Sequence, residues 1–319
     1  MHRPVLLDEV IGWLKPQDGA VLVDGTVGAG GHAAALARQV GPTGRVIGLD
    51  RDPAMLALAK ETTAGLPVTL VHAPYSAMRE VLEELGVSSV QGVLLDLGLS
   101  SDQLAWAHRG FSFASEGPLD MRFDPDVDPE SGSTSTSAGP TAAELLSSLS
   151  ADELAQVFFD YGEERFSRRI ARRIAETRRQ TPIETTRQLA ELVRQSVPGR
   201  FRHEPIDPAT RVFQALRIVV NDELGHLDRA LTKLPEILAP GGRAAVISFH
   251  SLEDRRVKWA FRNDPELTVL TRKPVTATAQ EVAVNPRARS AKLRVAERCP
   301  NLTRTPRPNR KRDLPTRGT

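Results

Sequence analysis

"VDGTVGAGGH", Val23–His32, is the stretch of sequence that decides the fold. It follows an apolar run, 20–24, typical of a buried strand, and precedes an alanine-rich run, 31–40, typical of a helix. Glycines in such a turn let a ligand approach the backbone, and the first N–H groups of the helix are free to bind it. The turn therefore predicts a ligand site on an α/β sheet, with a tight turn that holds no ligand as the alternative.

The alternation of strand and helix continues along the chain. Further strands are predicted at 45–50, 68–72, 91–98 and 243–249, and helices at 53–64, 76–85 and about 221–238. This order is typical of βαβ units on a parallel sheet. Two runs near the end, 266–271 and 290–298, are expected to pair as a hairpin.

The sheet is interrupted between about 105 and 211. A segment rich in Ser, Thr, Pro, Gly and Asp, 124–141, predicts a flexible surface loop. Helices are expected after it, at 141–149, 151–160, 163–179 and 185–196. Between Arg165 and Arg217 lie thirteen arginines, no lysine and five acidic residues, although the whole chain carries a net charge of only +2. Such a face suits phosphate, and a solvated helix face is the alternative.

Composition excludes several classes of protein. The 319 residues are 40% hydrophobic and 26% charged, which is typical of a globular chain with a sizeable core. A single cysteine, Cys299, excludes an intrachain disulfide and a zinc site built from several thiolates. No segment reaches the roughly 18 apolar residues of a membrane span. We therefore expect a cytoplasmic protein without a metal site and without membrane contact.

Acidic residues at the ends of the first two strands indicate the kind of ligand. Asp24 ends the first strand, and Asp50 ends the second, where a carboxylate accepts both hydroxyls of an adenosine ribose. A dinucleotide site would have the pattern G-x-G-x-x-G, whereas this turn follows acid-x-G-x-G-x-G with Thr26 in place of the first glycine. Asp24 would repel a pyrophosphate and suits a cationic amine. The turn thus favours S-adenosylmethionine over NAD, held by Asp24, Gly28, Gly30 and Asp50.

Longer blocks resemble one family. "DGTVGAGGH", "LLDLGLSSDQL", "RGFSF", "YGEERFSRRIARRI", "ISFHSLEDR" and "NPRARS" are similar to the ribosomal RNA small subunit methyltransferase H family, also called MraW, in order over nearly the whole chain. The resemblance implies a class I, Rossmann-like methyltransferase sheet with an inserted all-helical domain. The expected boundaries are 1–104 and 212–298 for the methyltransferase domain, 105–211 for the insertion and 299–319 for a disordered basic tail.

The resemblance also implies a function. Its members transfer a methyl group from S-adenosylmethionine to the exocyclic N4 of a cytidine in the decoding centre of 16S rRNA, the P-site region of the small ribosomal subunit, and members can form homodimers. Tyr75 stands where phenylalanine is common, but an aromatic face is retained. The cofactor positions that carry over are Gly30, Gly31, His32, Asp50, Tyr75, Asp96 and Gln103.

The residues leave the proton acceptor open. Asp96 and His250 follow two predicted strands and are the candidate catalytic residues, with a turn cap and a helix cap as their respective alternatives. The motif D-L-G-L at Asp96 lacks the prolines and aromatic residue of DNA amine methyltransferases, so their mechanism does not transfer. Rival classes are an NAD-dependent oxidoreductase, a non-enzymatic RNA-binding protein, and a methyltransferase of DNA or protein. The expected RNA contacts are Arg168, Arg169, Arg172, Arg173, Arg287 and Arg289.

Overall fold

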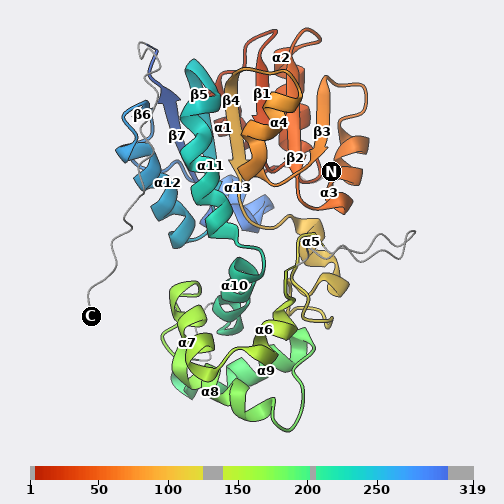
Figure 1. The fold of residues 1–319 in the computed structure, drawn as a ribbon, viewed down its shortest axis with the longest axis vertical. Coiled ribbons are helices and arrows are strands. Elements are labelled where there is room, and N and C mark those ends of the chain that lie inside the picture. Colours follow the sequence, from red (N-terminus) through yellow and green to blue (C-terminus); the bar gives the residue numbers. More distant parts are fainter. Residues whose placement is uncertain (1–3, 125–138, 202–205, 301–319) are drawn as a thin grey trace.

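A computed structural model describes residues 4–124, 139–201 and 206–300. Its centre is a seven-stranded sheet in the order β3-β2-β1-β4-β5-β7-β6, in which β6 and β7 are antiparallel to their neighbours and the other strands are parallel (Figure 1). The strands are β1 (Val21–Asp24), β2 (Arg45–Asp50), β3 (Val68–His72), β4 (Val90–Asp96), β5 (Leu238–Ser248), β6 (Leu267–Val269) and β7 (Lys292–Arg298).

Helices cover both faces of the sheet because successive side chains of a strand point to opposite sides. In β1, Leu22 packs in a cluster with α1 and α2, whereas its neighbour Val23 packs in a cluster with α4, α11 and α12. The first face carries α1 (Leu7–Leu14), α2 (Gly31–Val40) and α3 (Pro53–Thr62). The second carries α4 (Met78–Glu84), α11 (Glu223–Ile237) and α12 (Ser251–Asn263).

A second hydrophobic core lies among helices beyond the carboxyl ends of β1 and β4 (Figure 1). Fully buried side chains such as Phe158, Ile170 and Ile174 form it. Capping boxes begin three of its helices, at Thr141, Ser150 and Thr185. The helices are α6 (Ala142–Ser148), α7 (Ala151–Asp160), α8 (Ser167–Thr177), α9 (Thr186–Ser196) and α10 (Ala209–Val220).

One expected domain boundary does not coincide with the end of the helical core. Leu216, in α10, belongs to the helical core although it lies beyond the expected boundary at 211. The division into a discontinuous methyltransferase domain and an insertion remains a prediction. The expected loop 124–141 and tail 299–319 lie largely outside the described residues.

The sheet matches the sequence expectation, and the differences are local. The runs 266–271 and 290–298 do pair, as β6 and β7, but α13 (Ala279–Val284) and a short 3-10 helix, η4 (Pro286–Ser290), separate them, so they are not a tight hairpin. The helix expected at 163–179 begins only at Ser167, because Glu163 adopts a φ of 50°. The helices α1, α5 (Ser101–Ala105), α10 and α13 were not predicted from the sequence. None of the helices in the described part of the chain is long and apolar enough to span a membrane.

Candidate functional site

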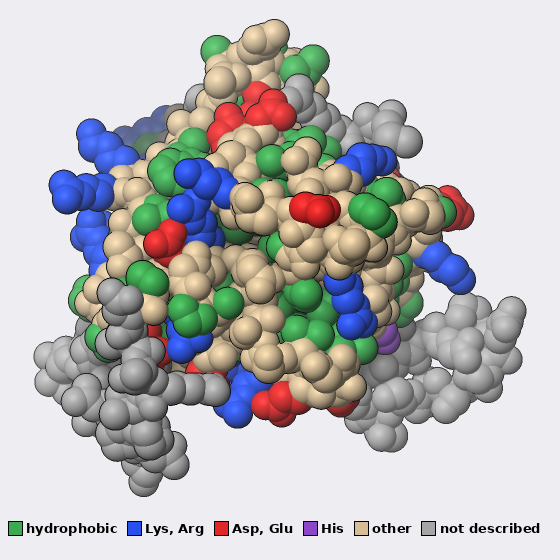
Figure 2. Space-filling model, turned by 90° about the horizontal axis from the view of Figure 1, so that it is seen from above, with side chains coloured by type: hydrophobic (Ala, Val, Ile, Leu, Met, Phe, Trp, Pro, Cys, Tyr) green, Lys and Arg blue, Asp and Glu red, His purple; other side chains and the backbone are tan. Residues whose placement is uncertain are grey.

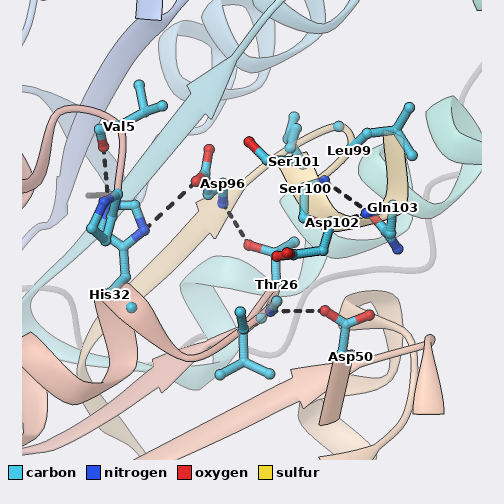
Figure 3. A pocket seen from close by; sticks show the side chains of 18 of the residues that line it. Val5, Thr26, His32, Asp50, Asp96, Leu99, Ser100, Ser101, Asp102 and Gln103 are labelled. Atoms are coloured by element: carbon cyan, nitrogen blue, oxygen red, sulfur yellow. Dashed lines mark hydrogen bonds and ion pairs between the residues drawn. The ribbon is translucent and has the colours of Figure 1, made fainter. Parts of the chain in front are cut away.

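A cavity of about 630 Å³ opens at the carboxyl ends of β1, β2, β4 and β5 (Figure 3). Its walls come from the turns after these strands and from the first turns of α2 and α5. Of the predicted cofactor residues, those that line the cavity are Gly28, Gly31, His32, Asp50, Tyr75, Asp96 and Gln103. Asp24, the last residue of β1, and Gly30 belong to the same segment as Gly28 but are not among the residues that line the cavity.

Asp24 is a buried carboxyl group at the start of the glycine turn. One of its oxygens accepts the N–H of Thr26 at 3.3 Å, and Oδ2 has no partner among the described residues. Burial raises the pKa of Asp24 from 3.8 to about 7. A buried carboxylate with an unsatisfied oxygen is suited to a cationic ligand group.

The turn itself needs its glycines. Gly28 adopts a φ of +51° and Gly30 a φ of +86°, a region that other residues rarely enter. Gly30 is the N-cap of α2, and a Cβ there would lie 3.1 Å from the Cα of Ala59. Thr26, which replaces a glycine of the usual pattern, has a role of its own. Its hydroxyl oxygen accepts the N–H of Asp96 at 2.6 Å and joins the turn to the end of β4.

Asp50 is held by backbone donors on both sides. Its Oδ2 accepts the N–H of Gly28 and its Oδ1 the N–H of Asp52, each at 2.9 Å. Burial raises the pKa of Asp50 to about 6. These contacts aim the carboxylate into the cavity next to the glycine turn, where the sequence predicted a ribose contact (Figure 3).

His32 and Asp96 lie next to each other in the wall of the cavity (Figure 3). The Nε2 of His32 lies 3.0 Å from the carbonyl oxygen of Val5, which only accepts, so Nε2 carries the proton and Nδ1 is bare. Nδ1 lies 3.6 Å from Oδ2 of Asp96, and Oδ1 of Asp96 has no partner among the described residues. Burial lowers the pKa of His32 to about 4, whereas burial and the charge of Asp24 raise that of Asp96 to about 7.

Two other predicted cofactor residues are held by their neighbours. The hydroxyl of Tyr75 donates to the carbonyl oxygen of Glu223 at 3.2 Å, and this bond fixes the side chain in the lining of the cavity. Gln103 accepts the N–H of Ser100 at 2.9 Å in a capping box and donates to Asp52 at 2.8 Å. The Gln103 side chain therefore fixes the wall of the cavity through contacts that the sequence alone did not reveal.

His250 caps a helix and does not line the cavity. Its Nδ1 accepts the N–H of Glu253 at 3.4 Å at the start of α12, and its Nε2 lies 3.1 Å from Glu253 Oε1. His250 is therefore the N-cap of α12, which is the alternative that the sequence left open. His250 is not among the residues that line the cavity, and its catalytic role stays a prediction.

Glu223, His250 and Glu253 have ligand atoms within 4.8 Å of one another, a spacing that a metal ion can use. The two carboxylates already have hydrogen-bond partners, whereas Nε2 of His250 is buried without a hydrogen-bond partner among the described residues. Arg217 donates to both oxygens of Glu223, at 2.7 and 2.9 Å, and the N–H groups of Phe249 and His250 donate to Glu253. The neighbouring Arg217 cation also disfavours a second cation. We assign no metal to this cluster.

The predicted RNA contacts fall into two groups. Arg168, Arg169, Arg172 and Arg173 are exposed on α8, well away from the cavity, and only Arg173 has an ion pair among the described residues, to Glu176 at 3.9 Å. The opposite end of the molecule carries scattered basic and acidic side chains without one continuous basic field (Figure 2). The arginine face of α8 is thus a distinct feature of the helical part.

Arg287 and Arg289 are separated by the structure although both lie in η4. Arg289 is exposed, whereas Arg287 is partly buried, lines the cavity and donates from Nη1 to the hydroxyl of Ser101 at 2.9 Å. The sequence predicts that both arginines hold phosphates. Because both residues are arginines, the sequence pattern could not show that one of them points into the cavity.

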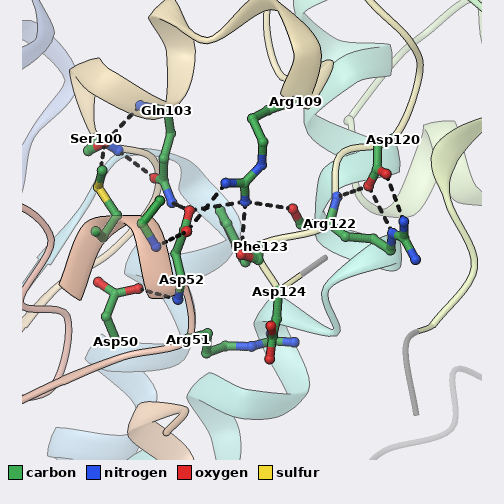
Figure 4. Close-up of polar contacts among 12 residues, drawn as sticks. Asp50, Arg51, Asp52, Ser100, Gln103, Arg109, Asp120, Arg122, Phe123 and Asp124 are labelled. Atoms are coloured by element: carbon green, nitrogen blue, oxygen red, sulfur yellow. Dashed lines mark hydrogen bonds and ion pairs between the residues drawn. The ribbon is translucent and has the colours of Figure 1, made fainter. Parts of the chain in front are cut away.

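A buried network behind Asp50 joins the cavity to the segment that leads into the helical part (Figure 4). Arg109 contacts Asp52 at 3.0 Å and donates to the carbonyl oxygens of Arg122 and Phe123, at 3.0 and 2.8 Å. The side chain of Asn221 accepts the N–H of Phe123 at 2.8 Å. Neither Arg109 nor Asn221 could be singled out from the sequence, because a buried polar residue resembles an exposed one in a sequence pattern.

The chain matches one protein family over nearly its whole length. The model of the MraW methylase family matches residues 1–299. A ribosomal RNA small subunit methyltransferase H of Syntrophotalea carbinolica is 49% identical, over 93% of this chain and 98% of the relative. The protein of the same name from Magnetococcus marinus is 48% identical over the same shares. A solved SAM-dependent O-methyltransferase from Thermotoga maritima has a TM-score of 0.43 and 14% identity, over 96% of this chain and 69% of that one, which is too low to bear on substrate.

The sheet order, the glycine turn and the family together define a methyltransferase that uses S-adenosylmethionine. The chain belongs to the MraW methylase family. The family is incompatible with two of the alternatives left open by the sequence, an NAD-dependent oxidoreductase and a non-enzymatic RNA-binding protein.

Proposed function

We propose that this enzyme transfers a methyl group from S-adenosylmethionine to the exocyclic N4 of a cytidine in the decoding centre of 16S rRNA. The observation that carries the proposal is the name shared by relatives 44–49% identical over 93% of the chain, ribosomal RNA small subunit methyltransferase H. The choice of N4 and of the decoding centre rests on the family resemblance. A ribosomal substrate also favours RNA over DNA or protein and agrees with the expected cytoplasmic location.

The cofactor fits the residues of the cavity. The unpartnered Oδ2 of Asp24 would hold the ammonium group, and Asp50, oriented by Gly28 and Asp52, would accept the ribose hydroxyls. The ring of Tyr75 lines the cavity and would pack against the adenine. S-adenosylmethionine supplies an electrophilic methyl carbon on a positively charged sulfur.

The chain must position the attacking amine and accept its proton. The lone pair of a cytosine N4 is delocalised into the ring, so alignment with the methyl carbon is the main task, with effects up to ~7–11 kcal/mol in well-oriented reactions. The nitrogen becomes cationic as its bond to carbon forms, and it then loses a proton. Asp96 is our candidate acceptor because its Oδ1 lies buried in the cavity without a partner among the described residues.

His32 assists Asp96 as a positioning residue. Its Nε2 proton is tied to Val5, so the bare Nδ1 faces Oδ2 of Asp96 and can accept a hydrogen bond when that carboxyl is protonated. The low pKa of His32, about 4, keeps the imidazole neutral at physiological pH. His32 can therefore accept a hydrogen bond from Asp96 once that carboxyl has taken the proton, without adding a charge that would repel a cationic cofactor.

The exposed arginines of α8 are proposed to hold rRNA phosphates. Guanidinium groups bind phosphate bidentately, and A-form RNA is recognised mainly by shape and backbone. The target base would be drawn out of its stack into the cavity, at a cost of a few kcal/mol. A homodimer remains an expectation of the family resemblance.

The test uses small ribosomal subunits from cells that lack this activity. The subunits are incubated with the protein and methyl-labelled S-adenosylmethionine, and the rRNA is digested to nucleosides. Labelled N4-methylcytidine at one position supports the proposal. Label in another nucleoside, or in protein, contradicts it. Naked 16S rRNA, tested in parallel, shows whether the assembled subunit is the substrate.

A further inference from the structure

One half of the cavity contains, besides Asp96, side chains that have no role in the cofactor assignment above. It lies beyond the ends of β4 and β5, and Asp96, Ser101, Phe249 and Arg287 line it. These residues come from segments far apart in the sequence, 96–101, 249 and 287. In open α/β sheets the substrate binds at this edge, next to the cofactor.

Arg287 is fixed in this half by its surroundings. The next residue, Ala288, is fully buried and packs in the core under α1 and α2, which anchors η4 against the sheet. Nη1 of Arg287 donates to Ser101 at 2.9 Å, so the guanidinium extends toward the end of β4. A guanidinium has five N–H donors and cannot accept a hydrogen bond. Among the described residues Ser101 is the one hydrogen-bond acceptor found for Arg287, so its other donors can bind a ligand in the cavity.

Arg287 and Asp96 form an electrostatic pair across this half. The charge of Arg287 lowers the pKa of Asp96, and the charge of Asp96 opposes the lowering that burial imposes on the pKa of Arg287. The cavity thus offers hydrogen-bond donors on one side and an unpartnered carboxylate oxygen, Oδ1 of Asp96, on the other. A ligand that fits both must carry acceptors next to a donor.

We propose that Arg287 reads the target base, by donating to N3 and O2 of a cytosine whose N4 donates to Asp96. This inference rests on the proposed function and adds the residue that determines base specificity. The Watson–Crick edge of cytosine presents two acceptors, N3 and O2, beside the N4 donor. Uracil presents an N–H at position 3 and an oxygen at position 4. It would set donor against donor at Arg287 and oxygen against oxygen at Asp96.

The position of Arg287 favours a base over a phosphate. A phosphate bound by Arg287 would have to enter a cavity that Asp50, Asp96 and Glu253 also line, and these carboxyl groups repel an anion. Bases that enzymes draw out of their stack are read through hydrogen bonds to their Watson–Crick edge. The exposed Arg289, two residues away, is free of these constraints and suits a phosphate.

The same motif supplies a matched pair of variants, Arg287→Met and Arg289→Met. We would measure kcat/KM for N4-methylcytidine formation and the binding of small subunits that carry either cytidine or uridine at the target position. For Arg287→Met we expect kcat/KM to fall about 10- to 100-fold and the preference for cytidine over uridine to be lost. For Arg289→Met we expect weaker, more salt-dependent binding of both subunits with the preference intact.

Three outcomes are informative. Equal loss by both variants, with the cytidine preference retained in each, would make Arg287 a phosphate contact and overturn the inference alone. Unchanged kcat/KM for Arg287→Met would do the same. Absence of N4-methylcytidine with the natural chain would overturn the proposed function and the inference with it. Calorimetric binding of S-adenosylmethionine by each variant shows that it is folded, and Arg287→Lys, which keeps the charge but not the fork, should recover only part of the cytidine preference.

Discussion

Arg109 and Asp52 form a buried ion pair, with 3.0 Å between Nη2 and Oδ2, that ties the segment following α5 to the first turn of α3 (Figure 4). Asp52 caps α3 through the N–H of Ala54 and stands two residues after Asp50, the predicted ribose contact. The arrangement links the part of the chain that holds the cofactor to the part that leads into the arginine-rich helices.

Removing one partner of this pair should be strongly destabilising. Arg109→Met leaves Asp52 buried without its cation, and we expect the free energy of unfolding to fall by about 3–5 kcal/mol. Urea denaturation followed by circular dichroism measures the change. The double variant with Asp52→Asn should lose less than the sum of the two single variants. A loss no larger than that of Glu83→Gln, which removes an exposed partner of Arg79, would contradict the buried pair.

Asp24 should stabilise the bound protein and destabilise the free one. The pKa of Asp24 in the folded chain, about 7, lies above its ordinary value of 3.8, so the folded chain binds a proton between these values that the unfolded chain has lost. The contribution of Asp24 to stability is complete below about pH 4 and is lost as the pH rises through 7. Asp24→Asn should therefore unfold at a higher temperature than the natural chain at pH 8 without cofactor.

The same substitution should weaken cofactor binding about 10- to 100-fold, because it removes a charge-assisted hydrogen bond to the ammonium group. Thermal unfolding at pH 5 and pH 8 and calorimetry with S-adenosylmethionine provide the two measurements. If the variant unfolds at a lower temperature than the natural chain at pH 8, the Asp24 carboxylate does not destabilise the protein without cofactor. Undiminished cofactor affinity would show that it is not a ligand.

Asp96 should give the reaction its pH dependence. The carboxyl group must be ionised to accept a proton, and its pKa in the protein without ligand is about 7. We expect kcat/KM for S-adenosylmethionine to rise as the pH increases through 7, and kcat to rise at a lower pH because the bound sulfonium favours the ionised form.

Asp96→Asn should lower kcat by about 100-fold or more, since general-base contributions are of order 10²–10⁴. Single-turnover methylation between pH 5.5 and 8.5 separates this chemical step from product release. A kcat that does not change with pH in the natural chain, or full activity of Asp96→Asn, would exclude Asp96 as the acceptor. His250→Gln serves as the comparison, and its activity should change little because His250 does not line the cavity.

The arginine face of α8 should contribute to substrate binding without affecting the cofactor. The double charge reversal Arg169→Glu with Arg172→Glu replaces two exposed cations that have no ion pair among the described residues. Small-subunit affinity should fall and its salt dependence should weaken by about one unit of log–log slope for each phosphate contact removed. S-adenosylmethionine affinity should stay the same.

The matched control reverses two exposed cations of a loop on the methyltransferase sheet, Arg272→Glu with Lys273→Glu. Filter binding at several salt concentrations and calorimetry with the cofactor measure the two affinities. Equal losses from the α8 variant and the control would show only a general effect of net charge. Parallel loss of cofactor affinity would show that the α8 variant had disturbed the fold.

The sheet and the glycine turn were predictable because their signals are local. A buried parallel strand reads as a short apolar run, and the turn at Val23–His32 carries its glycines and Asp24 in consecutive positions. Asp50 was found for the same reason, by its fixed separation from that turn. In contrast, the apolar run of α10 was not recognised as a separate helix, and Glu163 has a left-handed backbone conformation just before α8 that its residue type does not announce.

By itself, the sequence determined the class of sheet, the cofactor turn and the arginine-rich segment, since each is a pattern of neighbouring residues that local geometry converts into structure. Only the tertiary structure decided that Arg287 turns into the cavity while Arg289 faces solvent, that His250 caps α12, and that Arg109 reaches Asp52. Burial and the distance between charges set these roles. Both arise when segments separated by up to about two hundred residues are packed together.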